Sequence, residues 1–410
     1  MTQAPPTGRR AMRAARRSVL GFSALTPFLL AAPALAAERK PLRLGVLGDE
    51  NGPFADIGGP GVVEAVRMAV ADEGGAMFGR PIEIVVGATQ NKPDIAGAIA
   101  RQWFDVDGVD MIVDLPVTPV ALAVQTVARD RKKVVLQTAA ASADLTHKWC
   151  SPYSVHWIED TTALAGGTAR AVIAAGGRKW FFLTPDYAFG KTLQATATDV
   201  VHAQGAEVVG SATFPLGTPD YSSAILAAAS SPADTFAFGT TGGDTVNALK
   251  QAVEFNLRAK GRRLVVFNMF VPEIHALGLS VAQGLYITSG FYWDENDTTR
   301  AFAKRFFAAR GKMPNKSQAG AYAATRDYLR AVRAVGSADG PAVSQQMRRV
   351  PGDFFGKPVH IRANGRAIYD VTVWQVKTPA ESKYAWDYYK PVQHIRGDEV
   401  FGPDTKDCAQ

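Results

Sequence analysis

A glycine-rich loop near the start of the chain is the first segment that could do chemistry. The loop "GDENGPFADIGGPG" (48–61) follows an apolar run and precedes a helical pattern, an arrangement that can hold a phosphate group. It lacks the third glycine of a dinucleotide-binding motif, and the chain has no GxxxxGK(S/T) phosphate loop. We therefore predict that this loop is a wall of a ligand site, with Phe54 and Ile57 as its apolar contacts.

Patterns for catalysis or metal binding are scarce in the rest of the chain. The six histidines are scattered without an HExxH motif, no GxSxG nucleophile elbow follows the N-terminal segment, and no CxxC pair occurs. The sequence therefore predicts no enzyme, no metal site and no cofactor. An exported hydrolase is the alternative, because the members of a catalytic triad need not be neighbours in sequence.

Hydroxyl and aromatic residues follow several of the expected strands. Thr118 precedes a proline, a pairing typical of a helix start, and Ser142 lies in the small-residue segment "TAAASADLT". Backbone N–H groups at a helix start, together with hydroxyl groups, suit a carboxylate. Tyr187, Phe189 and Phe291 are the aromatic residues expected to cover the apolar body of such a ligand.

Two sets of alternating strands and helices must position these residues. In the first set we expect strands at 42–48, 82–88, 109–114 and 133–138, and helices at 60–73, 93–105 and 118–130. In the second set we expect strands at 179–185, 207–214, 235–240 and 263–268, and helices at 189–204, 220–230 and 243–258. A further strand, two long helices and short C-terminal strands follow. The pattern predicts an α/β fold with two doubly wound lobes, which bind ligands at the carboxyl ends of their strands.

The first 36 residues have the features of a cleaved export signal. Five arginines precede a mildly apolar stretch that ends in a small-x-small cleavage site at Ala36: Arg9, Arg10, Arg13, Arg16 and Arg17. The last two resemble a twin-arginine signal, and an ordinary Sec signal is the alternative. Without the five arginines the formal charge falls from +7 to about +2, so we expect no nucleic-acid partner.

The two cysteines are candidates for a covalent link. In an oxidising exported compartment, we expect Cys150 and Cys408 to form a disulfide. This bond would tie the C-terminal end to the middle of the chain. Two free thiols are the alternative.

A series of motifs resembles one protein family from about residue 41 to the C-terminus. Among these motifs are "GPFADIGGPG", "HWIEDTTALAGGTARAVI", "LTPDYAFG", "FYWDENDTTRAF" and "MPNKSQAGAY". They resemble the substrate-binding proteins of ABC transporters of the branched-chain amino acid type, which include leucine/isoleucine/valine-binding proteins. The resemblance implies a type I periplasmic binding fold, with two Rossmann-like lobes, a hinge of three crossovers and a ligand cleft between the lobes.

The same resemblance implies ligand contacts in the first lobe. In relatives, a Ser or Thr at the start of the third helix and the small-residue loop after the fourth strand hold the ligand carboxylate. The corresponding residues here are Thr118, Ala140 and Ser142. The aromatic residue of the first loop corresponds to Phe54 or Ile57.

Further contacts are implied at the crossover and in the second lobe. The crossover acid corresponds to Asp160, which is followed by Thr161. The second-lobe aromatic residue corresponds to Phe189, with Tyr187 nearby. Asp244, in "GTTGGDTVN", completes the expected ligand contacts of this lobe.

The acid that pairs with the α-ammonium group in amino-acid-binding relatives lacks a clear counterpart. The corresponding stretch is "FNMFVPEIHALG", in which we expect Glu273 to be displaced from that position. A buried ammonium group without a partner is costly. We therefore expect the ligand to be a short-chain, keto or aromatic acid, with a branched-chain or other amino acid as the alternative.

The resemblance predicts a monomeric periplasmic solute-binding protein that delivers its ligand to an ABC permease without changing it. Closure of the two lobes around the ligand is the expected mechanism. A ligand-sensing subunit of a membrane receptor is the alternative from another class. We expect the first lobe at 41–157 plus 290–355, the second at 158–289 plus 356–390, and a C-terminal tail at 391–410.

Overall fold

The computed structural model describes residues 40–404, which belong to one compact unit. The expected export signal (1–36) and Cys408 lie outside the described residues. Signal cleavage and the disulfide between Cys150 and Cys408 therefore stay predictions. Within residues 40–404, no helix is both long enough and apolar enough to cross a membrane.

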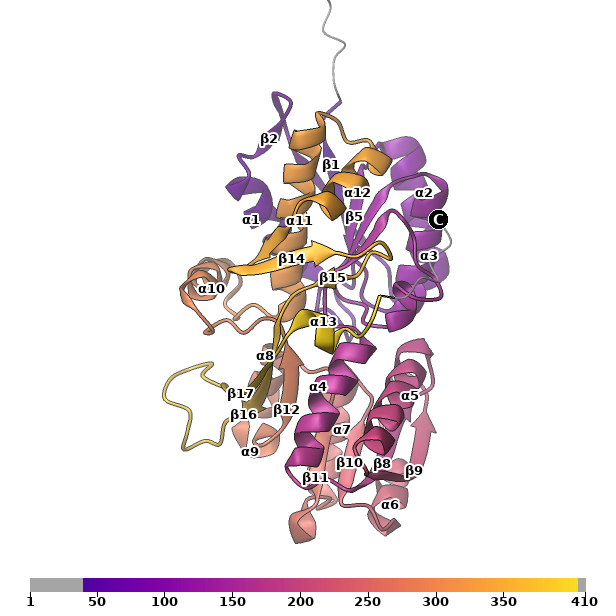
Figure 1. The fold of residues 1–410 in the computed structure, drawn as a ribbon, viewed down its shortest axis with the longest axis vertical. Coiled ribbons are helices and arrows are strands. Elements are labelled where there is room, and N and C mark those ends of the chain that lie inside the picture. The colour runs from indigo at the N-terminus through magenta and orange to yellow at the C-terminus, as the bar shows by residue number, and fades with distance from the viewer. Residues whose placement is uncertain (1–39, 405–410) are drawn as a thin grey trace, which may run out of the picture. The chain divides into compact units, whose positions relative to one another are not determined.

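The first lobe is built on a five-stranded parallel sheet with the strand order β4-β1-β5-β6-β7. Figure 1 labels β1 and β5 of this sheet. Its strands are β1 (Arg43–Gly48), β4 (Glu83–Ala88), β5 (Met111–Asp114), β6 (Val134–Gln137) and β7 (Ser154–His156). Two helix pairs, α1 with α11 and α2 with α3, pack on it. The helices of this lobe are α1 (Gly59–Asp72), α2 (Pro93–Gln102), α3 (Thr118–Asp130), α11 (Lys316–Val335) and α12 (Gly340–Arg349). Every residue of β5 and β6 is buried, as in a sheet covered on both faces.

The second lobe repeats this arrangement with a four-stranded parallel sheet in the order β11-β10-β8-β9. Its strands are β8 (Lys179–Pro185), β9 (Glu207–Phe214), β10 (Thr235–Phe238) and β11 (Arg263–Val266). Its helices are α4 (Thr161–Ala174), α5 (Ala188–Ala203), α6 (Ser222–Ser230), α7 (Gly243–Glu254), α8 (Val271–Leu277) and α9 (Leu279–Ala282).

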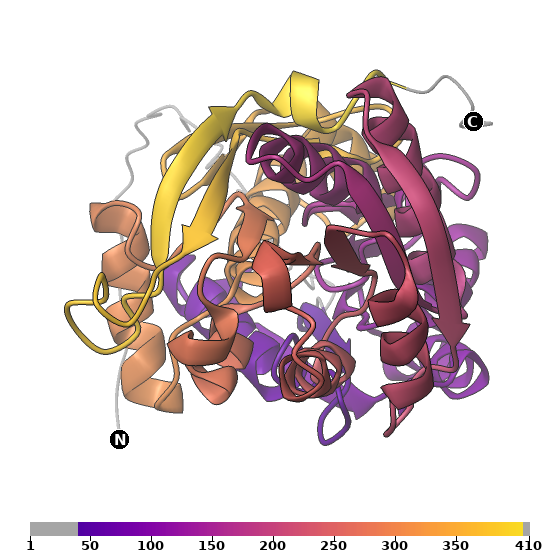
Figure 2. The same ribbon diagram turned by 90° about the horizontal axis from the view of Figure 1, so that it is seen from below.

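Smaller elements complete the two lobes. An antiparallel sheet of β12 (Tyr286–Ser289), β16 (Val371–Val376) and β17 (Tyr389–Ile395) packs on α4 (Figure 2). A second antiparallel sheet, on the first lobe, consists of β13 (Gly352–Phe354), β14 (Lys357–Ile361) and β15 (Ala367–Ile368). The remaining elements are the β2–β3 hairpin (Ala76–Met77 and Arg80–Pro81), α10 (Asp297–Arg310), α13 (Gly397–Val400), a π-helical turn (Trp103–Asp107) and two 3₁₀ turns (Ala143–Leu145 and Ala259–Gly261). The chain passes between the lobes three times: from β7 to α4, from β12 to α10, and from β15 to β16.

The two long helices after the second lobe begin and end at residues that favour helix boundaries. Asn296 precedes α10 and Asn315 precedes α11, and each side chain accepts a hydrogen bond from the backbone N–H three residues later. Gly311 and Gly336 follow these helices in the left-handed conformation, at φ of 67° and 77°. The start of α11 is therefore fixed by local sequence.

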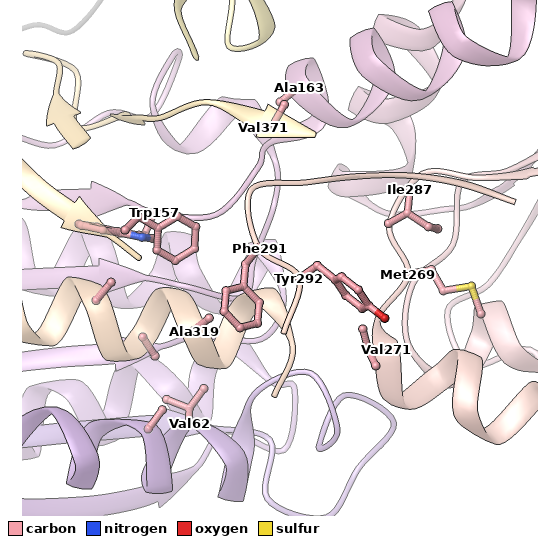
Figure 3. Packing of buried hydrophobic residues seen from close by; sticks show 14 of the residues in the cluster. Val62, Trp157, Ala163, Met269, Val271, Ile287, Phe291, Tyr292, Ala319 and Val371 are labelled. Atoms are coloured by element: carbon pink, nitrogen blue, oxygen red, sulfur yellow. The ribbon is translucent and has the colours of Figure 1, made fainter. Parts of the chain in front are cut away.

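One hydrophobic cluster continues from the first lobe through the crossovers into the second. Val62 and Ala319 belong to it on the first-lobe side, and Met269 belongs to it on the second-lobe side. Phe291, in one of the crossovers, lies between them, and Trp157, in another, lies on the side of Val62 and Ala319 (Figure 3). The crossovers are thus packed as core and not as exposed linkers.

The α/β fold class and the two sets of strands and helices predicted from the sequence are confirmed. Five strands were not expected: β2, β3, β7, β13 and β17. Of these, β17 lies partly in the segment expected as a C-terminal tail. Its central residues are exposed and include Pro391, because β17 is the edge strand of its sheet. An edge strand lacks the continuous apolar run that marks the other strands. The boundaries of the two lobes at 41–157 plus 290–355 and 158–289 plus 356–390 stay a prediction.

Candidate functional site

A cleft lies where the carboxyl ends of the strands in the two lobes meet. In this conformation the space left between its side chains is small, about 10 Å³, which is roughly what one water molecule needs. The first lobe contributes Ile57, Pro116, Val117, Thr118, Ala139, Ala140 and Ala141, and the second contributes Tyr187, Phe189, Thr241 and Asn268. No charged side chain from residues 40–404 lines the cleft. The residues of this set that the sequence predicts are Ile57, Thr118, Ala140, Tyr187 and Phe189.

Thr118 is the first residue of α3, and its side chain is 1% exposed. Its hydroxyl oxygen is buried and has no hydrogen-bond partner among the described residues. The first backbone N–H groups of a helix also lack partners within the helix and carry a partial positive charge. Thr118 thus presents a free hydroxyl and a helix start to the cleft, which together suit an anionic oxygen.

The small-residue loop after β6 forms the neighbouring wall of the cleft. Ala140 N–H donates to the carbonyl of Leu115 at 2.9 Å, which fixes the loop beside the start of α3. Ser142, the next hydroxyl residue, does not line the cleft. It is fully buried, and its Oγ accepts a hydrogen bond from Asp144 N–H at 3.3 Å. The hydroxyl of Ser142 therefore caps the following 3₁₀ turn.

The second lobe contributes two aromatic rings and two polar side chains. The rings of Tyr187 and Phe189 lie 6.0 Å apart at the start of α5. Burial, and secondarily the carboxylate of Asp244, raises the pKa of Tyr187, so its hydroxyl stays protonated. Asn268 Nδ2 donates to Thr241 Oγ1 at 3.2 Å, and Asn268 Oδ1 is buried without a partner among the described residues.

The crossover residues Asp160 and Thr161 do not line the cleft. Asp160 Oδ1 accepts hydrogen bonds from two backbone N–H groups in the first turn of α4, each at 3.0 Å. Its other oxygen lies 3.6 Å from Arg366 Nη1 in a buried ion pair. Thr161 Oγ1 accepts a hydrogen bond from Ala143 N–H at 3.2 Å. Both side chains have partners within the protein, which ties the crossover to the first lobe and to α4.

Three further expected contacts also lie outside the cleft lining. Phe54, in the first loop, is 1% exposed and packs in a hydrophobic cluster formed mainly by the first lobe. Phe291 lies in an aromatic cluster, with Phe355 5.0 Å away between ring centroids. Asp244 Oδ2 accepts a hydrogen bond from Gly217 N–H at 2.9 Å. A role for these residues in ligand binding stays a prediction.

A buried ion pair joins the three crossovers at the hinge. Glu159 Oε2 lies 3.1 Å from Lys316 Nζ, and both side chains are almost completely buried. Glu159 Oε1 accepts a hydrogen bond from Gly290 N–H at 2.6 Å and lies 3.2 Å from Tyr369 Oη. Tyr369 Oη also donates to the carbonyl of Trp157 at 2.7 Å. Glu159 therefore connects each of the three crossing segments.

The two lobes contact each other directly beside the cleft. Gly243 N–H, at the start of α7, donates to the carbonyl of Pro53 in the first loop at 3.3 Å. Phe270 of the second lobe packs in a hydrophobic cluster formed mainly by the first lobe, with Lys316 Nζ 5.4 Å from its ring centre. The structure is therefore a closed form.

Glu273, the acid of the second lobe, does not line the cleft. Its Oε2 accepts a hydrogen bond from the backbone N–H of Phe270 at 2.9 Å, as part of the capping box of α8. Burial raises the pKa of Glu273 to about 8, with a smaller contribution from the negative charge of Asp56. With a pKa of about 8, the carboxyl group keeps its proton near pH 7, and it caps the start of α8.

The loop between β16 and β17 contacts both lobes at another point. Trp386 stacks on His275 of α8, with ring centroids 3.9 Å apart and an interplanar angle of 7°. The ring of Phe307 in α10 is 6.4 Å from Trp386 in an edge-on arrangement. The backbone carbonyl of Trp386 accepts hydrogen bonds from Tyr292 Oη and Trp293 Nε1, each at 3.0 Å. This loop is thus anchored where α8 and α10 approach each other.

Sequence reasoning missed the polar pair of Thr241 and Asn268. Asn268 follows the apolar strand "RLVVF", and Thr241 follows "TFAFGT". A polar residue directly after a buried parallel strand was the available signal, because strand ends face the cleft. Among the described residues, no group of three or more His, Cys, Asp or Glu side chains could hold a metal ion.

Comparisons with known proteins agree with this architecture. Residues 41–383 match the family described as periplasmic binding protein. A crystal structure of a periplasmic binding protein from Burkholderia mallei is 43% identical, covers 90% of this chain and 98% of its own, and superimposes with a TM-score of 0.87. A branched chain amino acid ABC transporter periplasmic ligand-binding protein from Burkholderia xenovorans LB400 is 37% identical, with coverage of 88% and 97% and a TM-score of 0.79.

A curated relative gives a more partial match. Leu/Ile/Val-binding protein homolog 6 from Brucella melitensis is 27% identical over 247 residues, which are 60% of this chain. The chain spans 62% of the length of that relative. Because the family match extends over most of the sequence and includes both lobes, the chain belongs to the periplasmic binding protein family.

Proposed function

We propose that this protein binds a small carboxylic acid in its interlobe cleft, in the periplasm, and delivers it unchanged to an ABC importer in the membrane. The observation that carries the proposal is the unpartnered hydroxyl group of Thr118. Its buried hydroxyl has no partner among the described residues, and it lies at a helix start in a cleft that those residues line without a charged side chain. Membership of the periplasmic binding protein family supports delivery to a permease.

The cleft supports a ligand with one negative group and an otherwise uncharged body. The hydroxyl of Thr118 and the start of α3 offer donors to a carboxylate. The rings of Tyr187 and Phe189 and the methyl groups of Ala139 and Ala141 offer apolar surface for the remainder. Hydroxyl and backbone N–H groups at a helix start are sufficient to bind a carboxylate, so no buried lysine or arginine is needed. Short-chain, keto and aromatic acids all meet this description.

An amino acid is the second candidate because of the names of two relatives. One is a Leu/Ile/Val-binding protein homolog, and the other is the periplasmic ligand-binding protein of a branched chain amino acid ABC transporter. Against this candidate, the α-ammonium group would find no carboxylate among the described residues that line the cleft, and one carboxyl oxygen of Glu273 is engaged by the N-terminus of α8. Burial of an unpaired ammonium group is unfavourable.

A ligand screen tests the proposal directly. We expect monocarboxylates to raise the melting temperature of the purified protein, because a ligand that binds only the folded state stabilises it by mass action. Butyrate, 2-oxoisovalerate, benzoate and leucine cover the candidate classes. The bound ligand should be recovered chemically unchanged by mass spectrometry. Stabilisation by leucine alone would contradict the carboxylate proposal and favour amino acid binding.

A matched pair of variants links the screen to the cleft. Thr118→Val removes the hydroxyl at almost constant volume, and should weaken acid binding by about 10-fold or more because a hydrogen bond to a charged group is lost. Thr325→Val is the control, since the hydroxyl of Thr325 is also buried without a partner among the described residues but lies in α11 away from the cleft. Equal affinities in the two variants would show that Thr118 does not contact the ligand.

A further inference from the structure

Asn268 presents a second unpartnered polar atom to the cleft, in the lobe opposite Thr118. Its side chain is 2% exposed and follows β11, the end strand of the second sheet. One side of its amide is held by Thr241 Oγ1 at 3.2 Å, and the other side has no partner among the described residues. Buried polar groups are nearly always hydrogen-bonded, so the free side of this amide marks a place for a ligand atom.

The chemistry of the free amide atom restricts what it can bind. The oxygen and nitrogen of an asparagine amide are distinguished by their hydrogen-bond partners, and the hydroxyl of Thr241 can either donate or accept. A ligand hydroxyl can also donate or accept. It therefore satisfies Asn268 in either orientation of the amide.

Charged groups near Asn268 do not favour an ammonium group on the ligand. Two acids of the second lobe have other partners: Glu273 Oε2 accepts from Phe270 N–H, although its Oε1 is buried without a partner among the described residues, and Asp244 Oδ2 accepts from Gly217 N–H. Neither lines the cleft. A cationic group beside Asn268 would be buried without a counter-charge, whereas a neutral hydroxyl group would not.

We propose that Asn268, positioned by Thr241, selects a hydroxyl group on the part of the ligand that faces the second lobe. The preferred ligands are then hydroxycarboxylic acids, with the carboxylate at Thr118 and the hydroxyl at Asn268. This inference rests on the proposed function and narrows its ligand class. Asn268 is a specificity residue, and Thr241 is a positioning residue that fixes its amide.

Two ligand series of different length test the selection by isothermal titration calorimetry. One series is butyrate, 4-hydroxybutyrate and 4-aminobutyrate, and the other is benzoate, 4-hydroxybenzoate and 4-(aminomethyl)benzoate. In at least one series we expect the hydroxy acid to bind about 10-fold or more tightly than the unsubstituted acid, because a site built to hydrogen-bond a hydroxyl rejects an analogue that lacks it. The ammonium compounds should bind most weakly.

Variants at Asn268 separate selection from general binding. Asn268→Leu, which has the same branching at Cγ but no polar atom, should remove the preference, so that the hydroxylated and the unsubstituted acid bind with equal affinity. Thr118→Val should weaken both acids by the same factor. Asn268→Asp should reverse the order and favour the ammonium compound, because it adds a counter-charge at the same place. Thr241→Val removes the hydrogen bond that positions the amide of Asn268 and should reduce the preference for the hydroxy acid. This variant replaces Asn268→Leu in the test if Asn268→Leu does not fold.

The outcomes distinguish the two proposals. If acids bind but hydroxylated and unsubstituted members have equal affinity in both series, the selection by Asn268 is wrong and the proposed function stands. The selection is also wrong if the hydroxyl preference persists in Asn268→Leu. If no acid in either series binds, the proposed function fails and the selection fails with it.

Discussion

Gly242 of the second lobe lies directly against Phe54 of the first. A Cβ atom at residue 242 would be 2.9 Å from Phe54 Cδ1 and 2.9 Å from the carbonyl oxygen of Pro53. The neighbouring Gly243 N–H donates to the same carbonyl. Gly242 is therefore required for the close approach of the lobes as well as for its own positive φ of 67°.

Gly242→Ala should reduce the affinity for the ligand beyond what its loss of folding stability explains. The added methyl group strains the positive φ and also presses the first loop away from the second lobe. Gly205→Ala is the matched control, since Gly205 has φ of 70° and a methyl group there would meet no atom of the described residues within 4 Å. We expect both variants to lose about 1 kcal/mol of stability from the backbone strain. Only Gly242→Ala should reduce affinity by titration calorimetry; equal affinities would mean that this contact does not support closure.

Asn315 couples the start of α11 to the first ligand-binding loop. Its Oδ1 accepts from Gln318 N–H at 3.0 Å, and its Nδ2 donates to the carbonyls of Asp56 at 2.7 Å and Ile57 at 3.1 Å. Asn315→Ala should cost about 1 kcal/mol or more through the lost helix cap and should also loosen the loop that holds Ile57.

The matching control for Asn315 is at the start of α10. Asn296 has the same capping box, but its amide donates to the carbonyl of Phe355, away from the cleft. Asn296→Ala should lower the free energy of urea unfolding without changing ligand affinity, whereas Asn315→Ala should lower both. Similar affinities for the two variants would argue against a role of Asn315 in the site.

Replacing the lysine of the buried ion pair at the hinge should lower the free energy of unfolding. Lys316→Met leaves Glu159 buried without its counter-charge, which typically costs about 3–5 kcal/mol. Adding Glu159→Gln should recover part of that loss, because the remaining group is neutral. Lys312→Met is the comparison: its ion pair with Asp56 is exposed and should contribute about 0–1 kcal/mol. Urea unfolding of the wild type and these variants measures the losses, and equal losses for the two single lysine variants would contradict the structure of the hinge.

Glu273 should make stability depend on pH in a defined direction. Its pKa is about 8 in the folded protein and near 4.5 when unfolded, so the folded state retains a proton that the unfolded state releases between these values. The stabilisation by the protonated form is complete below about pH 4.5 and is lost as the pH rises towards 8. Glu273→Gln keeps an acceptor for Phe270 N–H and removes the titration.

Unfolding of the wild type and Glu273→Gln at pH 5 and pH 8 measures this effect. The stability of the variant relative to the wild type should increase with pH, by at most about 1.4 kcal/mol for each unit. Glu399→Gln, at an exposed position, should leave the pH dependence unchanged. Parallel pH dependences of the wild type and Glu273→Gln would show that Glu273 stays charged in the folded protein.

Local sequence determined much of the fold but only part of the site. The strands were predictable because burial on both faces requires a continuous apolar run. The helix start at Thr118 was predictable because a Thr-Pro pair is typical of the first residues of a helix. Phe291 packs on Phe355 from a distant hairpin, and its expected role at the ligand stays a prediction. The carboxylate of Asp160 is engaged by α4 and Arg366. Such partners arise from tertiary packing between remote segments, which a single sequence does not reveal.

The position of Trp386 has a practical consequence. Its indole ring lies between His275 of the second lobe and Phe307 of α10, which packs on the first lobe. Any change in the distance between those helices must alter the surroundings of this fluorophore. The protein thus contains an intrinsic optical probe of opening, and emission that changes with ligand in the wild type but not in Trp386→Phe would let the movement be timed without an attached dye.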